Sequence, residues 1–520
     1  MAKYESEDVS IEELRAEHDV YAGKSLDGNY AVPEKYKGTS ADKDDMNVLG
    51  RKQVLRRNFK FTTMLGFAST VLVAWEILPV ISVYALENGG TAIIFWSLIA
   101  GVIGMTFVYA SLAEMASMFP TSGGQYRLSY SVGWLTAMGW QVYLAGICFM
   151  VGSVIQGLIV LNNLETYTFH AWHGTLLTIG VVLFASIFNT LLATRLPLIE
   201  GTLLILHLAG LFAIIIPLWV MAPRGNVHDT LFNFTTTGGW SNLGLSSLIG
   251  MVNSIGVLIG YDCAVHMSEE VQDASRVLPK ALIWSVVPNG LMAIVMGVTF
   301  VFCIGDIDEV LASPTYEPFI QVFYNATRSN AGATVMASII AVMLTSACIS
   351  EVATASRQLW AFARDKGLPF SGWLSKVSPG YNIPLRAVLV SVVISSLLSL
   401  INIGSYVALN AINSLGVVSL LFSYNVTIGC MVWRRLFGAP LPQARWSLGK
   451  FGLAVNLVSL AFILPLTFFA FWPVTVNPTA AELNWSPVMF VGILSIAAVY
   501  YVVWGRHVYS GPVVLVKREV

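Results

Sequence analysis

Charged residues are scarce in this sequence. Of its 520 residues, 11% are Asp, Glu, Lys or Arg and 56% are hydrophobic, whereas about 25% of the residues in a soluble domain are charged. A chain with so few ions cannot cover its apolar surface in water, so we expect an integral membrane protein. The net charge of −1, without a basic run interleaved with aromatic residues, gives no indication of a nucleic-acid partner.

The sequence also lacks the residue spacings of metal, disulfide and catalytic sites. Its five cysteines fall in apolar stretches without CxxC spacing, and its seven histidines are scattered along the chain. We therefore expect buried thiols, no cofactor and no metal. A membrane enzyme would need a nucleophile with its base, and a channel would need a repeated filter motif. Neither pattern is found, so a transporter is favoured over these two alternatives.

The first 58 residues are hydrophilic and lack the apolar segment of a secretory signal peptide, so the first hydrophobic span must direct insertion. Twelve apolar stretches follow, each long enough to cross about 30 Å of hydrocarbon. They predict an all-α integral membrane protein with twelve transmembrane helices, at roughly 61–86, 91–117, 134–160, 175–194, 196–222, 246–270, 281–304, 332–360, 384–403, 405–433, 451–473 and 486–505.

The distribution of Lys and Arg orients these spans. With the amino terminus placed in the cytosol, 27 of the 29 basic residues lie on the cytosolic side, and Arg224 and Arg328 lie opposite. This asymmetry satisfies the positive-inside rule, so we expect both termini in the cytosol. The plasma membrane is the expected location, with a vacuolar or other organellar membrane as the alternative. Three sequons in predicted outer loops are glycosylation candidates: Asn233, Asn325 and Asn484.

Two spans combine small residues with ionisable ones at membrane depth. The first span reads MLGFASTVLVAWEIL and contains Glu76, and the sixth reads NSIGVLIGYDCAVHMSEE and contains Asp262. Glycines alone are explained by close helix packing, but an ionisable side chain in a bilayer usually faces a cavity or a partner. Transporters build midplane sites from helices broken at corresponding positions of two repeats. We therefore expect breaks at 69–74 and 256–260.

Three segments carry a family resemblance: LAEMASMFPTSGGQY after the second span, GYDCAVHMSEEVQDASRVLPKAL at the sixth, and SRQLWAFARDKGLPF after the eighth. Together they resemble the amino acid-polyamine-organocation superfamily of permeases, and more narrowly its fungal amino acid/choline branch. The resemblance implies two inverted five-helix repeats, with discontinuous first and sixth helices that hold the substrate between them. We accordingly expect a cytosolic tail at 1–58, a transport core at 59–433, helices 11 and 12 at 434–505, and a second tail at 506–520.

The substrate class follows from the chemistry of these two spans. Freed N–H groups at half-helix starts suit a carboxylate, whereas acidic and aromatic side chains suit an ammonium group. An amino acid or GABA, which carries both charges, is therefore expected, with choline, a polyamine or another organic cation as the alternative. The Gly-x-Gly of many superfamily members is represented in the first span only by Gly66 and small residues. The candidate substrate-binding residues are Ser69, Thr70, Ala74, Trp75, Glu76, Gly256, Gly260, Tyr261 and Asp262.

Coupling to protons is expected, with alternating access as the mechanism. The fifth span lacks the lysine that some proton-coupled relatives carry and instead contains Glu200 and His207. A histidine is a usable proton carrier because its ordinary pKa lies near 6.5, so His207 and His266 are candidates together with Glu200. Sodium coordination by Thr345 and Ser346 of the eighth span is the weaker alternative.

Charged residues also gather at the predicted inner face. Glu114, at the inner end of the second span, is positioned to meet a basic residue such as Arg364. With Arg357 and Asp365 these residues form either a scaffold, which we favour, or an inner gate that opens and closes.

The expected topology can be tested with terminal tags. We expect a tag at either terminus to resist protease added to intact cells, because 27 of 29 basic residues lie on the side of the termini. Digestion of either tag from outside would contradict this topology, and permeabilised cells provide the control for tag accessibility.

Overall fold

The computed structural model describes residues 32–123, 130–379, 381–404, 406–480 and 483–509, with side chains except at 83–84 and 406–413. Within these residues the chain is helical, and its β-structure consists of two isolated bridges, Phe59 with Val271 and Asn88 with Thr236. The all-α fold class expected from the sequence is therefore confirmed.

Eleven helical stretches in the described part of the chain are long and apolar enough to cross a membrane. The first consists of two consecutive helices, α3 (Phe61–Leu72) and α4 (Ala74–Ile81). The others are built around α6 (Gly90–Met118), α7 (Tyr130–Asn162), α8 (Ala171–Thr190), α9 (Leu196–Met221), α13 (Ala274–Cys303), α16 (Asn330–Arg364), α18 (Leu385–Ser399), α20 (Tyr406–Phe437), α21 (Gly452–Phe469) and α22 (Ser486–Tyr500).

The sixth expected span is the exception, because it is interrupted. Its first part, α11 (Leu243–Gly256), is too short to cross a bilayer alone, and the chain then runs without helix to the single turn α12 (Cys263–His266). Gly260 lies in this irregular stretch with φ +124, a conformation that residues with a side chain rarely adopt. The break therefore falls where the glycines of this span predicted it.

The first span is broken as well, but by a valine. Val73 has φ 40 and ψ 49, the left-handed conformation, and separates α3 from α4. A β-branched residue is disfavoured there, so the surrounding packing must hold the chain in this conformation. The discontinuities expected in the first and sixth helices are confirmed.

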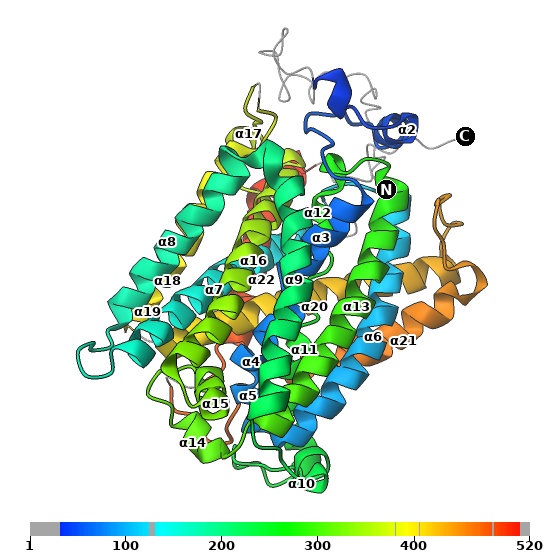
Figure 1. Cartoon of the computed structure of the whole chain (residues 1–520). Coiled ribbons are helices and arrows are strands. Elements are labelled where there is room, and N and C mark those ends of the chain that lie inside the picture. The colour runs from blue at the N-terminus through cyan, green and yellow to red at the C-terminus, as the bar shows by residue number, and fades with distance from the viewer. Residues whose placement is uncertain (1–31, 124–129, 380, 405, 481–482, 510–520) are drawn as a thin grey trace.

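The broken first span lies in the centre of the bundle (Figure 1). Of its most apolar window, 83% is buried inside the protein, compared with 17% for the span built on α22. α3 packs against α9, α13 and α16, and α7 packs against α16 and α20. Irregular backbone at membrane depth is tolerated only where protein or a cavity surrounds it, and this central position satisfies that condition.

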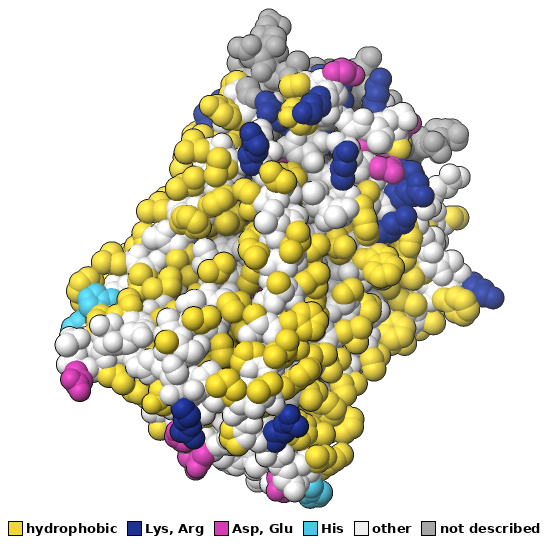
Figure 2. Space-filling view, viewed as in Figure 1, with side chains coloured by type: hydrophobic (Ala, Val, Ile, Leu, Met, Phe, Trp, Pro, Cys, Tyr) yellow, Lys and Arg dark blue, Asp and Glu magenta, His cyan; other side chains and the backbone are white. Residues whose placement is uncertain are grey.

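The surface agrees with a multi-pass membrane protein. Hydrophobic side chains cover the middle of the molecule, and Lys and Arg gather at one end (Figure 2). That end carries α2 (Ser40–Val48) and α17 (Ser371–Leu374), whereas α10 (Val227–Leu231), α14 (Ile307–Leu311) and α15 (Pro318–Thr327) lie at the opposite end (Figure 1). We refer to these as the α2 end and the α10 end.

Candidate functional site

A cavity of about 520 Å³ lies beside both helix breaks. This size is typical of a small-molecule site. Its wall is mostly apolar, and none of the described Lys, Arg or His side chains lines it. The wall consists of Val71, Leu72, Ile77, Ile81, Glu87, Val142, Tyr143, Gly146, Ile147, Met150, Ile249, Val252, Asn253, Gly256, Val257, Glu351, Ser414, Val417, Phe469, Ala470, Trp472, Val474, Thr475, Leu483 and Asn484.

Most of the predicted substrate-binding residues lie behind this wall. Gly256 lines the cavity, at the end of α11. In α4, the residues that line the cavity are Ile77 and Ile81, which share one helix face because they are four positions apart. Glu76 is on another face of the same helix. The other predicted residues are also buried but do not line the cavity: Ser69, Thr70, Ala74, Trp75, Gly260, Tyr261 and Asp262.

Glu76 and His207 form a buried pair that shares a proton. Glu76 Oε1 lies 2.6 Å from His207 Nδ1, and His207 Nε2 lies 2.8 Å from Asn289 Oδ1. The Asn289 amide donates through Nδ2 to the Ser285 carbonyl at 2.8 Å, so its oxygen accepts from His207 Nε2–H. The contact to Glu76 then needs one further proton, on either the imidazole or the carboxyl group. The indole N–H of Trp75 donates to the His207 carbonyl at 3.2 Å and fixes this arrangement.

Glu200 connects three helices through hydroxyl groups. Thr70 Oγ1 on α3 donates to Glu200 Oε2 at 2.6 Å, and Ser350 Oγ on α16 donates to Glu200 Oε1 at 2.7 Å. A predicted coupling residue on α9 thus binds a residue predicted to contact substrate. The hydroxyls of Thr345 and Ser346 donate to carbonyls of their own helix, α16, at 2.7 and 2.6 Å.

Asp262 and His266 lie together but do not form an ion pair. The Tyr424 hydroxyl donates to Asp262 Oδ1. His266 Nε2 accepts from the Trp140 indole at 3.0 Å, and Nδ1 donates to the Ser122 carbonyl at 3.0 Å. In this arrangement the hydrogen of the imidazole is on Nδ1 and Nε2 has none. The 3.3 Å contact between Nε2 and Asp262 Oδ2 is therefore not a hydrogen bond.

Glu351 is a functional candidate that our reading of the sequence missed. It lies on α16, is 1% exposed, lines the cavity, and its Oε2 has no hydrogen-bond partner among the described residues. The signal was present, because Glu351 is the acidic residue of an otherwise uncharged apolar stretch at 332–356. An ionisable residue inside a span is a functional candidate by default.

The predicted contact between Glu114 and Arg364 is wrong. Glu114 pairs with Arg435 of α20 and accepts hydrogen bonds from Ser447 Oγ at 2.9 Å and the Leu448 N–H at 3.0 Å. The reason is that α6 packs on α21, which turns Glu114 toward the segment between α20 and α21. Arg364 instead binds Glu269 through two nitrogens, at 2.8 and 2.6 Å.

The Glu269–Arg364 pair belongs to a buried ion cluster at the α2 end, which we call the closing cluster: Arg51, Glu269, Arg364 and Asp365. Arg51 Nη2 lies 2.6 Å from Asp365 Oδ1, and Arg51 Nη1 lies 4.0 Å from Glu269 Oε1. The cluster joins the segment before α3, the 3₁₀ turn η4 (Ser268–Glu270) and the end of α16. Beside it, Arg357 Nε donates to Glu270 Oε1 at 2.7 Å.

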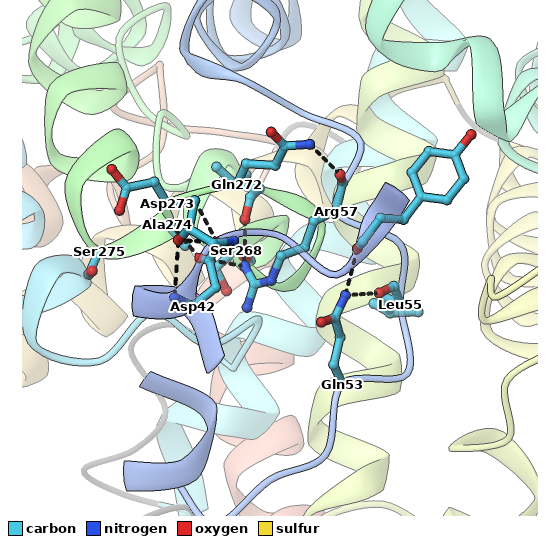
Figure 3. Close-up of polar contacts among 12 residues, drawn as sticks. Asp42, Gln53, Leu55, Arg57, Ser268, Gln272, Asp273, Ala274 and Ser275 are labelled. Atoms are coloured by element: carbon cyan, nitrogen blue, oxygen red, sulfur yellow. Dashed lines mark hydrogen bonds and ion pairs between the residues drawn. The ribbon is translucent and has the colours of Figure 1, made fainter. Parts of the chain in front are cut away.

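The amino-terminal segment is fastened to the start of α13 (Figure 3). Arg57 Nη1 lies 3.2 Å from Asp42 Oδ1 and donates to the Ser268 carbonyl at 3.1 Å. Asp42 also accepts from the N–H groups of Asp273 and Ala274 at 2.8 and 3.0 Å, which satisfies free donors at the helix start. The segment from α2 to α3 is therefore held against the start of α13 at the α2 end.

The three sequons differ in their surroundings. Asn233 is exposed, and Asn325 lies half-buried within α15. Asn484 lines the cavity, and its Nδ2, the atom that would carry a glycan, donates to the carbonyls of Ala470 and Trp472 at 3.0 and 3.2 Å. A glycan on Asn484 would break both bonds.

Comparisons with known proteins agree with this architecture. A family model described as amino acid permease matches residues 59–494. A Macrophomina phaseolina protein with the provisional name amino acid/polyamine transporter is 30% identical over 431 residues, covering 80% of this chain and 93% of that protein. Amino-acid permease 2 of Neurospora crassa is 26% identical, covering 93% of this chain and 91% of the relative.

A third fungal relative is named a choline transporter, and solved transporter structures share the fold. The choline transporter of Saccharomyces cerevisiae is 27% identical, covering 92% of this chain and 90% of the relative. A crystal structure of a mutant manganese transporter from Eremococcus coleocola aligns with a TM-score of 0.51 at 14% identity, covering 86% of this chain and 95% of that one. At this identity the likeness is one of fold.

The contacts of Glu114 predict a scaffold role. We expect Glu114→Gln to lower the free energy of unfolding by about 3 kcal/mol, because it leaves the mostly buried Arg435 without its charge partner. Thermal unfolding of the purified protein checks this. Glu309→Gln, at an exposed position of α14, is the control. An unchanged melting temperature together with slower turnover would contradict the scaffold role.

Proposed function

The chain belongs to the amino acid permease family, and from this premise we propose that it is a proton-driven secondary transporter of amino acids, GABA or related amines such as choline. The observation that carries this proposal is the cavity whose wall includes both helix breaks, Val71 and Leu72 beside the first and Gly256 and Val257 beside the second. A small molecule in this cavity contacts the two segments that alternating access must move.

We propose that the structure represents the state closed at the α2 end. The closing cluster and the Asp42–Arg57 pair join the amino-terminal segment, the start of α13 and the end of α16. The cavity, in contrast, continues to Glu87, directly after α5 (Val83–Leu86), and to Trp472 and Val474 beyond α21. With the α2 end in the cytosol, the cavity would face the outside, and opening inward would require Arg51 and Arg364 to leave their carboxylate partners.

Proton coupling is assigned to the Glu76–His207 pair. Asn289 occupies one imidazole nitrogen as an acceptor, so the short contact to Glu76 holds together only while one additional proton is present. Loss of this proton would leave two lone pairs facing each other at 2.6 Å, which favours movement of α4 relative to α9. Since α4 also carries Ile77 and Ile81 of the cavity wall, the proton and the substrate act on one helix.

The predicted substrate-binding residues behind the cavity wall would act on the substrate indirectly. Trp75 and Glu76 would affect the substrate through the position of α4, and Asp262 through the irregular stretch before α12. These side chains do not line the cavity in this structure. Their direct contact with the substrate stays a prediction, and it would require a different conformation at the two breaks. Glu200 supports the first break, because it binds Thr70 three residues before Val73.

Uptake by the full-length protein in liposomes tests this function. The panel consists of amino acids, GABA, polyamines and choline, with a pH gradient imposed. We expect saturable uptake of at least one of these amines, accelerated when the outside is more acidic and unaffected by a sodium gradient. Absence of uptake for the whole panel would contradict the proposal, and acceleration by sodium alone would replace the proton as coupling ion.

The role of the buried pair can be separated from substrate binding. We expect His207→Gln to abolish the acceleration by the pH gradient but to retain exchange of substrate across the membrane, because exchange needs no net proton movement. His228→Gln, on an exposed histidine of α10, is the matched control. Normal gradient-driven uptake by His207→Gln would place the coupling proton elsewhere.

A further inference from the structure

The cavity wall contains a carboxylate, that of Glu351, for which the described residues provide no counter-charge. We propose that Glu351 binds the positively charged nitrogen of the substrate, and that the cavity therefore selects organic cations over molecules with a carboxylate. This inference rests on the proposed function, because it names the substrate class of the same cavity.

Glu351 reaches the cavity from a helix face made of small residues. Ala347 and Ala355, one turn before and one turn after it on α16, are completely buried. The same cavity wall also includes Tyr143 of α7 and the end of α11 at Gly256 and Val257. Since alanines flank Glu351 on its own helix, its carboxylate is the polar group that α16 presents to the cavity.

Among the described side chains, none neutralises the carboxylate of Glu351. Its Oε2 is buried without a hydrogen bond among the described residues, and the nearby charged group is a second carboxylate, Asp262. Three other buried acids each have a partner at one oxygen or at both. Glu76 Oε1 has His207, although Glu76 Oε2 is unpaired among the described residues, Glu200 has two hydroxyl donors, and Asp262 has Tyr424. A buried carboxylate must take up a proton or pair with a cation. Because Glu351 lines the cavity, the positively charged nitrogen of the substrate can be that cation.

The rest of the wall favours an ammonium group. Tyr143 and Trp472 are aromatic residues of the wall, and the face of an aromatic ring attracts cations. None of the described Lys, Arg or His side chains lines the cavity, so a substrate carboxylate would find no basic partner there.

Two backbone donors at the second break are already in use. Following the break in the sixth span, the N–H groups of Gly260 and Tyr261 both donate to the Tyr109 hydroxyl, at 2.9 and 3.2 Å. The same hydroxyl donates to the Leu258 carbonyl at 2.9 Å. Tyr109 thus occupies two of the donors at this break, which leaves fewer of them for a substrate carboxylate.

Binding of choline to the purified full-length protein tests the inference, with GABA and glutamate as further probes. We expect wild-type protein to bind choline more tightly than GABA and to bind glutamate most weakly. Glu351→Gln is expected to weaken choline binding about 30-fold or more, because it removes one partner of a buried charge pair. Glu351→Asp, which keeps the charge, should restore most of the affinity.

Glu317→Gln is the matched control, because it removes a buried carboxyl group just before α15 that does not line the cavity. We expect choline binding by this variant to equal that of the wild type. An equal loss in both variants would show a general effect of removing buried carboxyl groups and would overturn the assignment of Glu351.

The probes themselves give a test that does not depend on a folded variant. Wild-type protein is expected to bind choline at least about 30-fold more tightly than 3,3-dimethyl-1-butanol, which has the same shape without the charge. Equal affinity for the two would overturn the inference, as would unchanged choline binding by Glu351→Gln. If the protein still transports any member of the panel, either result overturns the inference but not the proposed transport function. Absence of all uptake would contradict the transport function itself.

Discussion

A carboxylate among membrane-spanning helices must receive a proton, hydrogen-bond donors or a cation, and the interior of this protein is arranged around that requirement. Each buried acid meets it differently. Glu76 shares a proton with His207, Glu200 accepts two hydroxyl bonds, and Asp262 accepts one from Tyr424. Glu351 lines the cavity, and its Oε2 has no donor in the described part of the chain. We infer from this difference that the first three acids stabilise the protein or take part in coupling, whereas Glu351 binds the substrate.

The helix breaks depend on the same environment. Freed backbone groups can be satisfied only in the centre of the bundle, and Tyr109 does this at the second break with one hydroxyl that receives two N–H bonds and donates one. The cavity lies beside both breaks, with Val71 and Leu72 next to the first and Gly256 and Val257 next to the second. At the α2 end, the closing cluster and the amino-terminal segment bind the elements that follow the second break.

The sequence predicted the spans well because hydropathy and length determine which segments cross a bilayer. It also predicted the second break, since Gly256 and Gly260 mark a position where helix is weak. The first break could be located but not explained, because Val73 adopts its left-handed conformation through packing and not through its own preference. Side-chain partners were less predictable. Glu114 could face several basic residues, and the packing of α6 on α21 selects Arg435.

The cavity wall shows the same limit. Spacing placed Glu76 near the first break, but the rotation of α4 turns Ile77 and Ile81 to the cavity and Glu76 to His207. This rotation depends on the conformation of one residue, Val73, and cannot be read from periodicity. Glu351 could have been found, because a single acid in a long apolar stretch is itself a signal.

The most direct test of this account is a cryo-electron microscopy map of the purified protein with bound choline. The account predicts density for the trimethylammonium group beside the Glu351 carboxylate and within about 6 Å of the Tyr143 ring. Density against Glu76 or Asp262, with the space beside Glu351 empty, would contradict it.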